Sequence, residues 1–436
     1  KIGTHDCDGA EFTMYTRYTQ LFSPKLDVPE TAGDLLDEAV YLRNRKLEER
    51  YGFRFRETAY YNTVEGNDAP RRLLASGDAT YKLITGRYLN MFHYAAEGYF
   101  TPVTELAKID VNEPYWSAEM YETLSLAGKH FFAAGDFNIS AYDFTHVLLF
   151  NKEMAKAQSL PDLYALVDEG AWTFDRFYEM SAAATKDANG DGAMDASDRY
   201  GYTARPSAVL PAFWVAAGAE PVKKNADAHA EFTAASDEDF LALYESVLAH
   251  LRDTGVWYVS PDGAAGDNVP SDLFRAGGAL FLDAKLYEVN ALRDCDVEFG
   301  ILPYPKAAEE QKNYRARMEG CELFGVPLTN TEHEMTGVIL EAMACESRAS
   351  VIPEYKEKML KSRATRDRVS SAVLDLVFAN LVFDYGDTLL GGDFRDGLMN
   401  RCFQQNQRNI VSLLKKSTQP YQKTLDTFNT AFAALK

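Results

Sequence analysis

The first ninety residues alternate between strand-forming and helix-forming segments, and this order is the feature that most restricts the fold. Segments 11–16, 53–58 and 81–85 are rich in β-branched and aromatic residues, whereas 34–50 and 68–76 have the spacing of helices. A helix between two strands carries the chain back to the starting edge of the sheet, so consecutive strands pair in parallel. The order therefore predicts an α/β sheet.

Polar and aromatic side chains lie at the carboxyl ends of these predicted strands. Ligands of open α/β sheets bind outside those ends. Tyr15 belongs to the end of the first strand, and Arg87 and Tyr88 follow the third. We therefore expect these three residues to face a binding cleft.

The acidic stretch 187–198 fits the calcium-loop pattern D-x-[DN]-x-[DN]-G over its first six positions. Gly192 stands at the sixth position, where such a loop turns sharply. The predicted ligands at positions 1, 3, 5, 7, 9 and 12 are Asp187, Asn189, Asp191, the carbonyl of Ala193, Asp195 and Asp198. The sequence predicts one bound Ca²⁺, and the alternative is a solvated acidic turn held by Asx hydrogen bonds.

A structural rather than a regulatory ion is expected in this loop. Residues 172–186 predict an entering helix, but 200–206 indicate a strand or coil, and no second loop exists. A paired helix switch is therefore not expected. Asp198 is shorter than the usual glutamate at position 12, so another part of the chain could complete the ligand shell.

Composition and motifs narrow the classes of function. The net charge of −20 argues against nucleic acid and anionic membrane surfaces as partners. The five cysteines form no C-x-x-C pair, and no apolar run reaches membrane-spanning length. H-E-x-x-H, G-x-S-x-G, P-loop and G-x-G-x-x-G motifs are all absent, so the sequence predicts no enzyme of those classes.

Several stretches together resemble extracellular solute-binding proteins of ABC importers, in the sugar-binding, maltose-binding-like class. The most specific is WTFDRF (172–177), which leads into the calcium loop and then into DRYG (198–201). Four weaker stretches occur in the same order, namely LEERYGF (47–53), LFNK (149–152), FRAGGALF (274–281) and GILPYPK (300–306).

This resemblance implies a two-lobed, periplasmic-binding-protein-like α/β fold of the class II type, with discontinuous lobes joined by hinge strands. Chain crossings are expected near 133–138, 282–285 and 319–324. Lobe one would then hold 1–134 plus 284–320, and lobe two 135–283 plus 321–436. The helical C-terminal extension, from residue 369 onward, would cover part of the cleft.

The resemblance also implies a carbohydrate ligand, which suits aromatic rings and planar hydrogen-bonding groups. The candidate stacking residues are Trp214, Trp257 and Tyr258, with a core position as the alternative for each. The polar and aromatic candidates near the crossings are Asp136, Asn138, Asp143, Tyr287 and Glu288.

A solute-binding protein would capture an oligosaccharide by hinge closure and deliver it to a membrane permease. The resemblance further implies a monomer outside the cell, tethered by an N-terminal lipid anchor upstream of residue 1, with no membrane insertion of the folded part. Two alternatives stay open: a secreted glycan-active hydrolase or lyase with a carboxylate pair, and a sensor component that presents its ligand to a membrane receptor.

Overall fold

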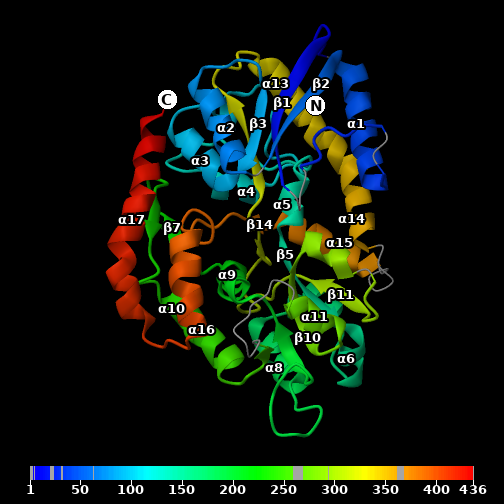
Figure 1. Cartoon of the computed structure of the whole chain (residues 1–436), viewed down its shortest axis with the longest axis vertical. Coiled ribbons are helices and arrows are strands. Elements are labelled where there is room, and N and C mark those ends of the chain that lie inside the picture. The colour runs from blue at the N-terminus through cyan, green and yellow to red at the C-terminus, as the bar shows by residue number, and fades with distance from the viewer. Residues whose placement is uncertain are drawn as a thin grey trace.

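Two five-stranded sheets at opposite ends of an elongated molecule form two lobes (Figure 1). The structure is a computed structural model of the chain. It describes residues 3, 5–19, 24–30, 33–61, 63–258, 269–292, 294–360 and 368–435.

The first sheet has the order β2-β1-β3-β13-β4. Its strands are β1 (Ala10–Tyr18), β2 (Phe53–Tyr61), β3 (Leu83–Arg87), β4 (Phe100–Thr101) and β13 (Glu322–Pro327). β1 pairs in parallel with both β2 and β3, as the strand–helix order predicts. Helices α1 (Leu35–Tyr51) and α2 (Val64–Ala75) make the two connections, and α3 (Tyr88–Ala96) follows β3.

The second sheet has the order β11-β5-β10-β6-β9. Its strands are β5 (His146–Asn151), β6 (Tyr200–Thr203), β9 (Trp257–Tyr258), β10 (Ala279–Lys285) and β11 (Phe299–Leu302). β6 runs parallel to β9 and β10, so the carboxyl ends of these three strands meet at one edge. β10 is fully buried up to Ala284 and reads as a continuous apolar run broken only by Asp283.

The remaining elements surround the two sheets. The helices are α4 (Ala118–Leu124), α5 (Ile139–Asp143), α6 (Lys152–Ala157), α7 (Leu163–Asp168), α8 (Phe174–Ala184), α9 (Pro206–Ala217), α10 (Glu238–Val247), α11 (Val269–Arg275), α12 (Leu286–Val289), α13 (His333–Glu346), α14 (Ile352–Leu360), α15 (Arg368–Ala379), α16 (Arg401–Gln404) and α17 (Ile410–Ala434). The short strands are β7 (Val222–Lys224), β8 (Ala230–Phe232), β12 (Ala316–Arg317) and β14 (Leu381–Val382), and the other helical segments are η1 (Val103–Glu105), η2 (Leu248–Arg252), η3 (Asn290–Leu292), η4 (Ser347–Val351) and η5 (Gly391–Asn400).

The lobe boundaries differ from the predicted ones after residue 283. β11, inside the segment 284–320 expected in lobe one, pairs with β5 of the second sheet. β13, inside the segment 321–436 expected in lobe two, pairs with β3 and β4 of the first sheet. The predicted crossing at 282–285 is therefore wrong, because β10 and β11 both pair with β5 and the chain stays in lobe two until β12.

The chain does pass between the lobes at the other two predicted places. α5 lies between the sheets and leads into β5, and the connection from β12 to β13 returns the chain to lobe one (Figure 1). Residues 129–136 form no strand. This segment makes only isolated bridges, and Phe131 and Phe132 are held by packing on the rings of Phe432 and Phe92.

The C-terminal part of the chain is helical, as predicted, and it contacts both lobes. α13, η4 and α14 pack along α1, whereas α15 packs against β11. α17 packs on β8 through Tyr421 and on α3 through Phe428 and Phe432. No helix within the described ranges combines the length and the apolar character of a membrane span.

Candidate ligand-binding site

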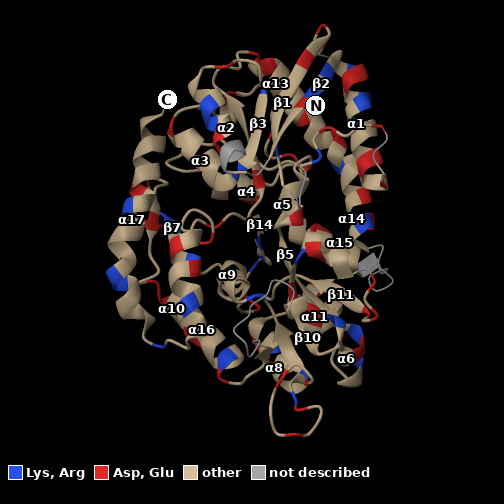
Figure 2. Cartoon of the chain, viewed as in Figure 1, with Lys and Arg blue, Asp and Glu red and all other residues tan. Residues whose placement is uncertain are grey.

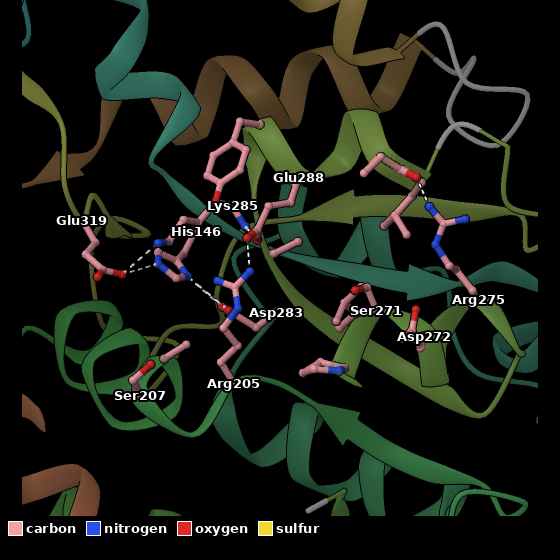
Figure 3. A pocket seen from close by; sticks show the side chains of 17 residues that line it. His146, Arg205, Ser207, Ser271, Asp272, Arg275, Asp283, Lys285, Glu288 and Glu319 are labelled. Atoms are coloured by element: carbon pink, nitrogen blue, oxygen red, sulfur yellow. Dashed lines mark hydrogen bonds and ion pairs between the residues drawn. The ribbon is translucent and has the colours of Figure 1, made fainter. Parts of the chain in front are cut away.

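A pocket of about 900 Å³ opens at the carboxyl ends of β6 and β10. Its volume suits a small-molecule ligand. α9, α11, α12 and the end of β10 supply most of its walls, and Glu319 enters from the connection between the lobes (Figure 3). Its polar or aromatic lining residues are His146, Arg205, Ser207, Ser271, Asp272, Arg275, Asp283, Lys285, Tyr287, Glu288 and Glu319.

Several charged groups of the pocket form ion pairs with one another. Arg205, which precedes the first residue of α9, forms an ion pair with Glu288 of α12. The Oε2 atom of Glu288 also accepts a hydrogen bond of 2.9 Å from the backbone N–H of Lys285. Lys285 Nζ lies 3.3 Å from Glu319 Oε2. The pocket therefore presents hydrogen-bond donors and acceptors side by side, in fixed orientations.

His146 connects the pocket to the interior of lobe two. Its Nδ1 lies 3.0 Å from Asp283 Oδ1 (Figure 3). Asp283 also accepts a hydrogen bond of 2.6 Å from the Tyr304 hydroxyl. Burial alone would raise the pKa of Asp283, but the neighbouring His146 and these hydrogen bonds hold it below its ordinary value. Asp283 is therefore a carboxylate at neutral pH.

Glu319 is the pocket carboxylate with the most cationic surroundings. Its Oε2 lies 3.1 Å from Arg317 Nη2 and 3.3 Å from His146 Nε2. Burial opposes ionisation here, but the charge of Arg317, with smaller contributions from Lys285 and Arg395, holds the pKa of Glu319 well below its ordinary value. Glu319 can therefore only accept hydrogen bonds from a ligand.

Two residues expected to contact a ligand, Tyr287 and Glu288, lie in this pocket. The Tyr287 ring also packs edge-on against Phe144, with centroids 5.6 Å apart. Sequence reasoning missed Arg205 and Asp283. Both stand at or directly after the carboxyl end of a strand in the second sheet, so the strand-end rule, applied to this lobe as well, would have identified them.

The three aromatic residues expected to stack on a sugar lie in the core of lobe two. Trp214 is 1% exposed, and its Nε1–H donates a hydrogen bond of 3.1 Å to Asp384 Oδ1. Trp257 donates to the carbonyl of Ala204 at 3.2 Å and packs against Phe403. Tyr258 is also buried. The core position, stated above as the alternative, is the one that the structure shows for these residues.

The candidates of lobe one lie on the first sheet and outside the lining of the pocket. Tyr15 stacks on Tyr60 and contacts Tyr81, with centroid distances of 4.7 and 4.9 Å. Arg87 is exposed, and its guanidinium lies 5.3 Å from the centroid of the Tyr88 ring. Tyr88 itself is buried.

The three polar candidates near the first crossing bind other protein groups. Asp136 accepts hydrogen bonds from the Tyr142 hydroxyl and from Arg348, and Asn138 Nδ2 donates to the carbonyl of Glu322 at 2.9 Å. Asp143 accepts a hydrogen bond of 2.8 Å from the Tyr355 hydroxyl. Burial raises the pKa of Asp136 to about 6, and that of Asp143 also to about 6. These contacts stabilise the segment in which the chain passes between the lobes, and the three residues do not line the pocket.

The acidic loop 187–198 joins α8 to β6 at the end of lobe two farthest from lobe one (Figures 1 and 2). A bridge between Lys186 and Arg199 closes it, and Gly192 has a φ of +82°, the left-handed conformation expected at the sixth position. The backbone N–H groups of Gly190 and Gly192 donate to Asp187, at 2.6 and 2.8 Å.

The loop offers the oxygen ligands that Ca²⁺ takes. The carboxylate of Asp198 is buried and accepts two backbone N–H hydrogen bonds of 2.8 Å, from Ala188 and Asp195. In this conformation the side chains form Asx-type hydrogen bonds. Over the described part of the chain, no group of three or more His, Cys, Asp or Glu side chains converges as a metal site.

No protein-family model matches this sequence, and no curated protein matches it. Solved structures do match over the whole chain. A sugar transporter from Rhizobium etli, in an open conformation, is 13% identical with a TM-score of 0.63, over 98% of this chain and 100% of that one. An ABC substrate-binding protein from Listeria monocytogenes in complex with cycloalternan is 15% identical with a TM-score of 0.53, over 98% and 100%.

The apo form of RafE from Streptococcus pneumoniae is 12% identical with a TM-score of 0.57, over 98% of this chain and 97% of that one. At such low identity these likenesses show the fold. The chain has the two-lobed, periplasmic-binding-protein-like α/β fold, and this confirms the predicted fold class.

Proposed function

We propose that this protein captures a carbohydrate in the pocket at the edge of lobe two and delivers it to a membrane permease of an ABC importer. The observation that carries the proposal is the set of paired charges at the carboxyl ends of β6 and β10. Planar carboxylate and guanidinium groups make two hydrogen bonds at once, which suits adjacent hydroxyl groups of a sugar. The similarity to a binding protein solved with cycloalternan supports the same ligand class.

Capture would proceed by closure of the two lobes about the connections at α5 and at 318–321. Glu319 stands on the second connection and lines the pocket, so a ligand that bonds to it contacts the hinge directly. A ligand that also reached the exposed Arg87 of lobe one would favour the closed form, because only that form makes both contacts.

The proposal places the protein outside the cell as a monomer, with the permease as its partner and without nucleic acid. The upstream lipid anchor stays a prediction. A sensor that presents the same ligand to a membrane receptor would use the same pocket, so the two roles differ only in the partner.

A glycan hydrolase is the weaker candidate on the chemistry of the pocket. Such an enzyme needs one carboxylic acid that is protonated at its working pH, beside a second that is ionised. The pKa values of Asp283 and Glu319 are both held below their ordinary values, by neighbouring cations and hydrogen bonds. Of the four carboxylates that line the pocket, these two are therefore not suited to donate a proton at neutral pH.

Isothermal calorimetry against a panel of oligosaccharides, with peptides and polyamines as competing classes, tests the proposal. We expect one glycan class to bind and the other classes to give no heat. Arg205→Met should weaken that binding at least tenfold, because Glu288 loses its partner and the ligand loses a planar donor. Arg176→Met, on the exposed face of α8, is the matched control and should bind normally. A peptide or polyamine that bound while every sugar failed would exclude the carbohydrate assignment.

We also propose that the loop 187–198 binds one structural Ca²⁺. Its donor types and the conformation of Gly192 support this. Addition of Ca²⁺ to chelator-treated protein should raise the melting temperature without changing the secondary structure, because an ion bound only to the folded state stabilises it. Asp187→Ala should abolish the rise, while Asp227→Ala, in another exposed turn, should keep it. Identical melting curves with and without Ca²⁺ would contradict the proposal.

A further inference from the structure

The position of Glu319 is determined by residues from a distant part of the chain. Beside its contacts with Arg317 and Lys285, the Oε1 atom of Glu319 lies 3.0 Å from Arg395 Nη1. Arg395 belongs to η5 in the C-terminal segment and does not line the pocket. Each carboxylate oxygen of Glu319 therefore contacts an arginine that does not line the pocket, and the Glu319 side chain remains 21% exposed.

Asp387 organises the two arginines that hold Glu319. Arg317 is 1% exposed, and it donates two hydrogen bonds to Asp387, from Nε at 2.6 Å and from Nη2 at 2.9 Å. Arg395 Nη1 lies 3.0 Å from Asp387 Oδ1 and 3.1 Å from its carbonyl oxygen. Asp387 is itself fixed by its backbone N–H, which donates to Asp384 Oδ1 at 2.7 Å. These two hydrogen bonds to Asp387 hold the guanidinium of Arg317 in a single orientation.

We propose that Asp387 and Arg395 are positioning residues for ligand binding: they fix Glu319, through Arg317 and directly, as an acceptor for ligand hydroxyl groups. This inference rests on the proposed function of the pocket. A free glutamate side chain loses rotamer freedom when it binds a ligand, and this loss weakens binding. A glutamate already held by two guanidinium groups avoids most of that cost, and its Oε1 atom, which accepts from Arg395, has a second lone pair for the ligand.

The same arrangement has a consequence for pH. Burial opposes the ionisation of Glu319, and the cations, with Arg317 first, overcome it. Removal of Arg395, one of these cations, should raise the pKa of Glu319 toward its ordinary value. A protonated Glu319 donates through one oxygen and loses acceptor capacity. Ligand binding by such a variant should therefore weaken on acidification, whereas Glu319 causes no loss in the wild-type protein.

Calorimetry with maltotetraose, or with the tightest-binding glycan of the panel above, tests this at pH 5 and pH 7.5. We expect Arg395→Met to bind about tenfold more weakly at pH 7.5 and still more weakly at pH 5, and Arg395→Lys to recover most of the affinity. Combined with Glu319→Gln, Arg395→Met should add no further loss, because both changes remove one interaction. Arg408→Met is the matched control, since this arginine pairs with Asp253 on an exposed surface.

Equal affinity and an equal pH profile in wild type and Arg395→Met would overturn the inference, as would losses that add in the double variant. Failure of the wild-type protein to bind any glycan would instead refute the proposed function. In that case the role of Arg395 is tested by a pH titration of the Glu319 carboxyl ¹³C resonance in the ligand-free protein. Its titration should move to higher pH in Arg395→Met, and an unchanged titration would refute the role of Arg395. Thermal melting of each variant confirms that it is folded.

Discussion

At the scale of single residues, the burial of Trp214 shows that this tryptophan packs in the core and does not stack on a ligand. Its ring packs against Phe240 and Phe394, and its N–H is satisfied by Asp384. We expect Trp214→Ala to lower the free energy of unfolding by about 3–5 kcal/mol, because it leaves a cavity and removes one of the hydrogen bonds to the buried Asp384 carboxyl. Urea denaturation measures this loss. An unchanged denaturation midpoint would contradict the core position of Trp214.

Glu322, the first residue of β13, carries a pH dependence of stability. It is 3% exposed and pairs with Arg17, while its Oε2 atom has no hydrogen-bond partner. Burial raises its pKa from an ordinary value of 4.5 to about 7, against the opposing charge of Arg17. Because the folded-state pKa is the higher one, the stabilisation is complete below about pH 4.5 and is lost as the pH rises through about 7.

Glu322→Gln should remove this contribution, which amounts to at most about 3 kcal/mol over that range. Denaturation midpoints measured from pH 4.5 to pH 8 should fall less steeply in the variant than in the wild-type protein. Asp136 and Asp143 titrate in the same range, so some slope should remain. Glu11→Gln, on the exposed face of β1, is the control. Parallel curves for Glu322→Gln and wild type would contradict the assignment.

At the scale of elements, β6 and α8 approach so closely that only glycine fits between them. A Cβ atom on Gly201 would lie 2.2 Å from the carbonyl oxygen of Ser181 in α8. We expect Gly201→Ala to push the helix away and to lower the free energy of unfolding by about 1–3 kcal/mol. Gly33→Ala, where a Cβ meets no atom within 4 Å, is the control. Equal stability of the two variants, measured by urea denaturation, would show that α8 can shift freely.

At the scale of the whole molecule, the proposed capture requires the lobes to move together. Small-angle scattering should show a smaller radius of gyration in the presence of a bound glycan, at the mass of one chain. Arg205→Met, which should bind weakly, is the control and should keep the ligand-free value at the same glycan concentration. An unchanged radius in the saturated wild-type protein would exclude closure as the mechanism.

The sequence by itself determined the local units of this protein. The parallel order of β1, β2 and β3 follows from alternation of strand and helix, and the turn at Gly192 follows from the spacing of the acidic loop. Each of these features depends on residues close together in the chain, whose periodicity and turn preferences are visible without the fold.

The tertiary structure alone decided which segments share a lobe and which side chains line the pocket. β13 belongs to the first sheet because it pairs with β3, more than two hundred residues earlier. Trp214 is a core residue because α10 and η5, from two other parts of the chain, cover it, and Glu319 faces the pocket because Asp387 orients Arg317. Such pairings join residues separated by long stretches of chain, and their free energy comes from burial and charge pairing in the folded state, which no local pattern records.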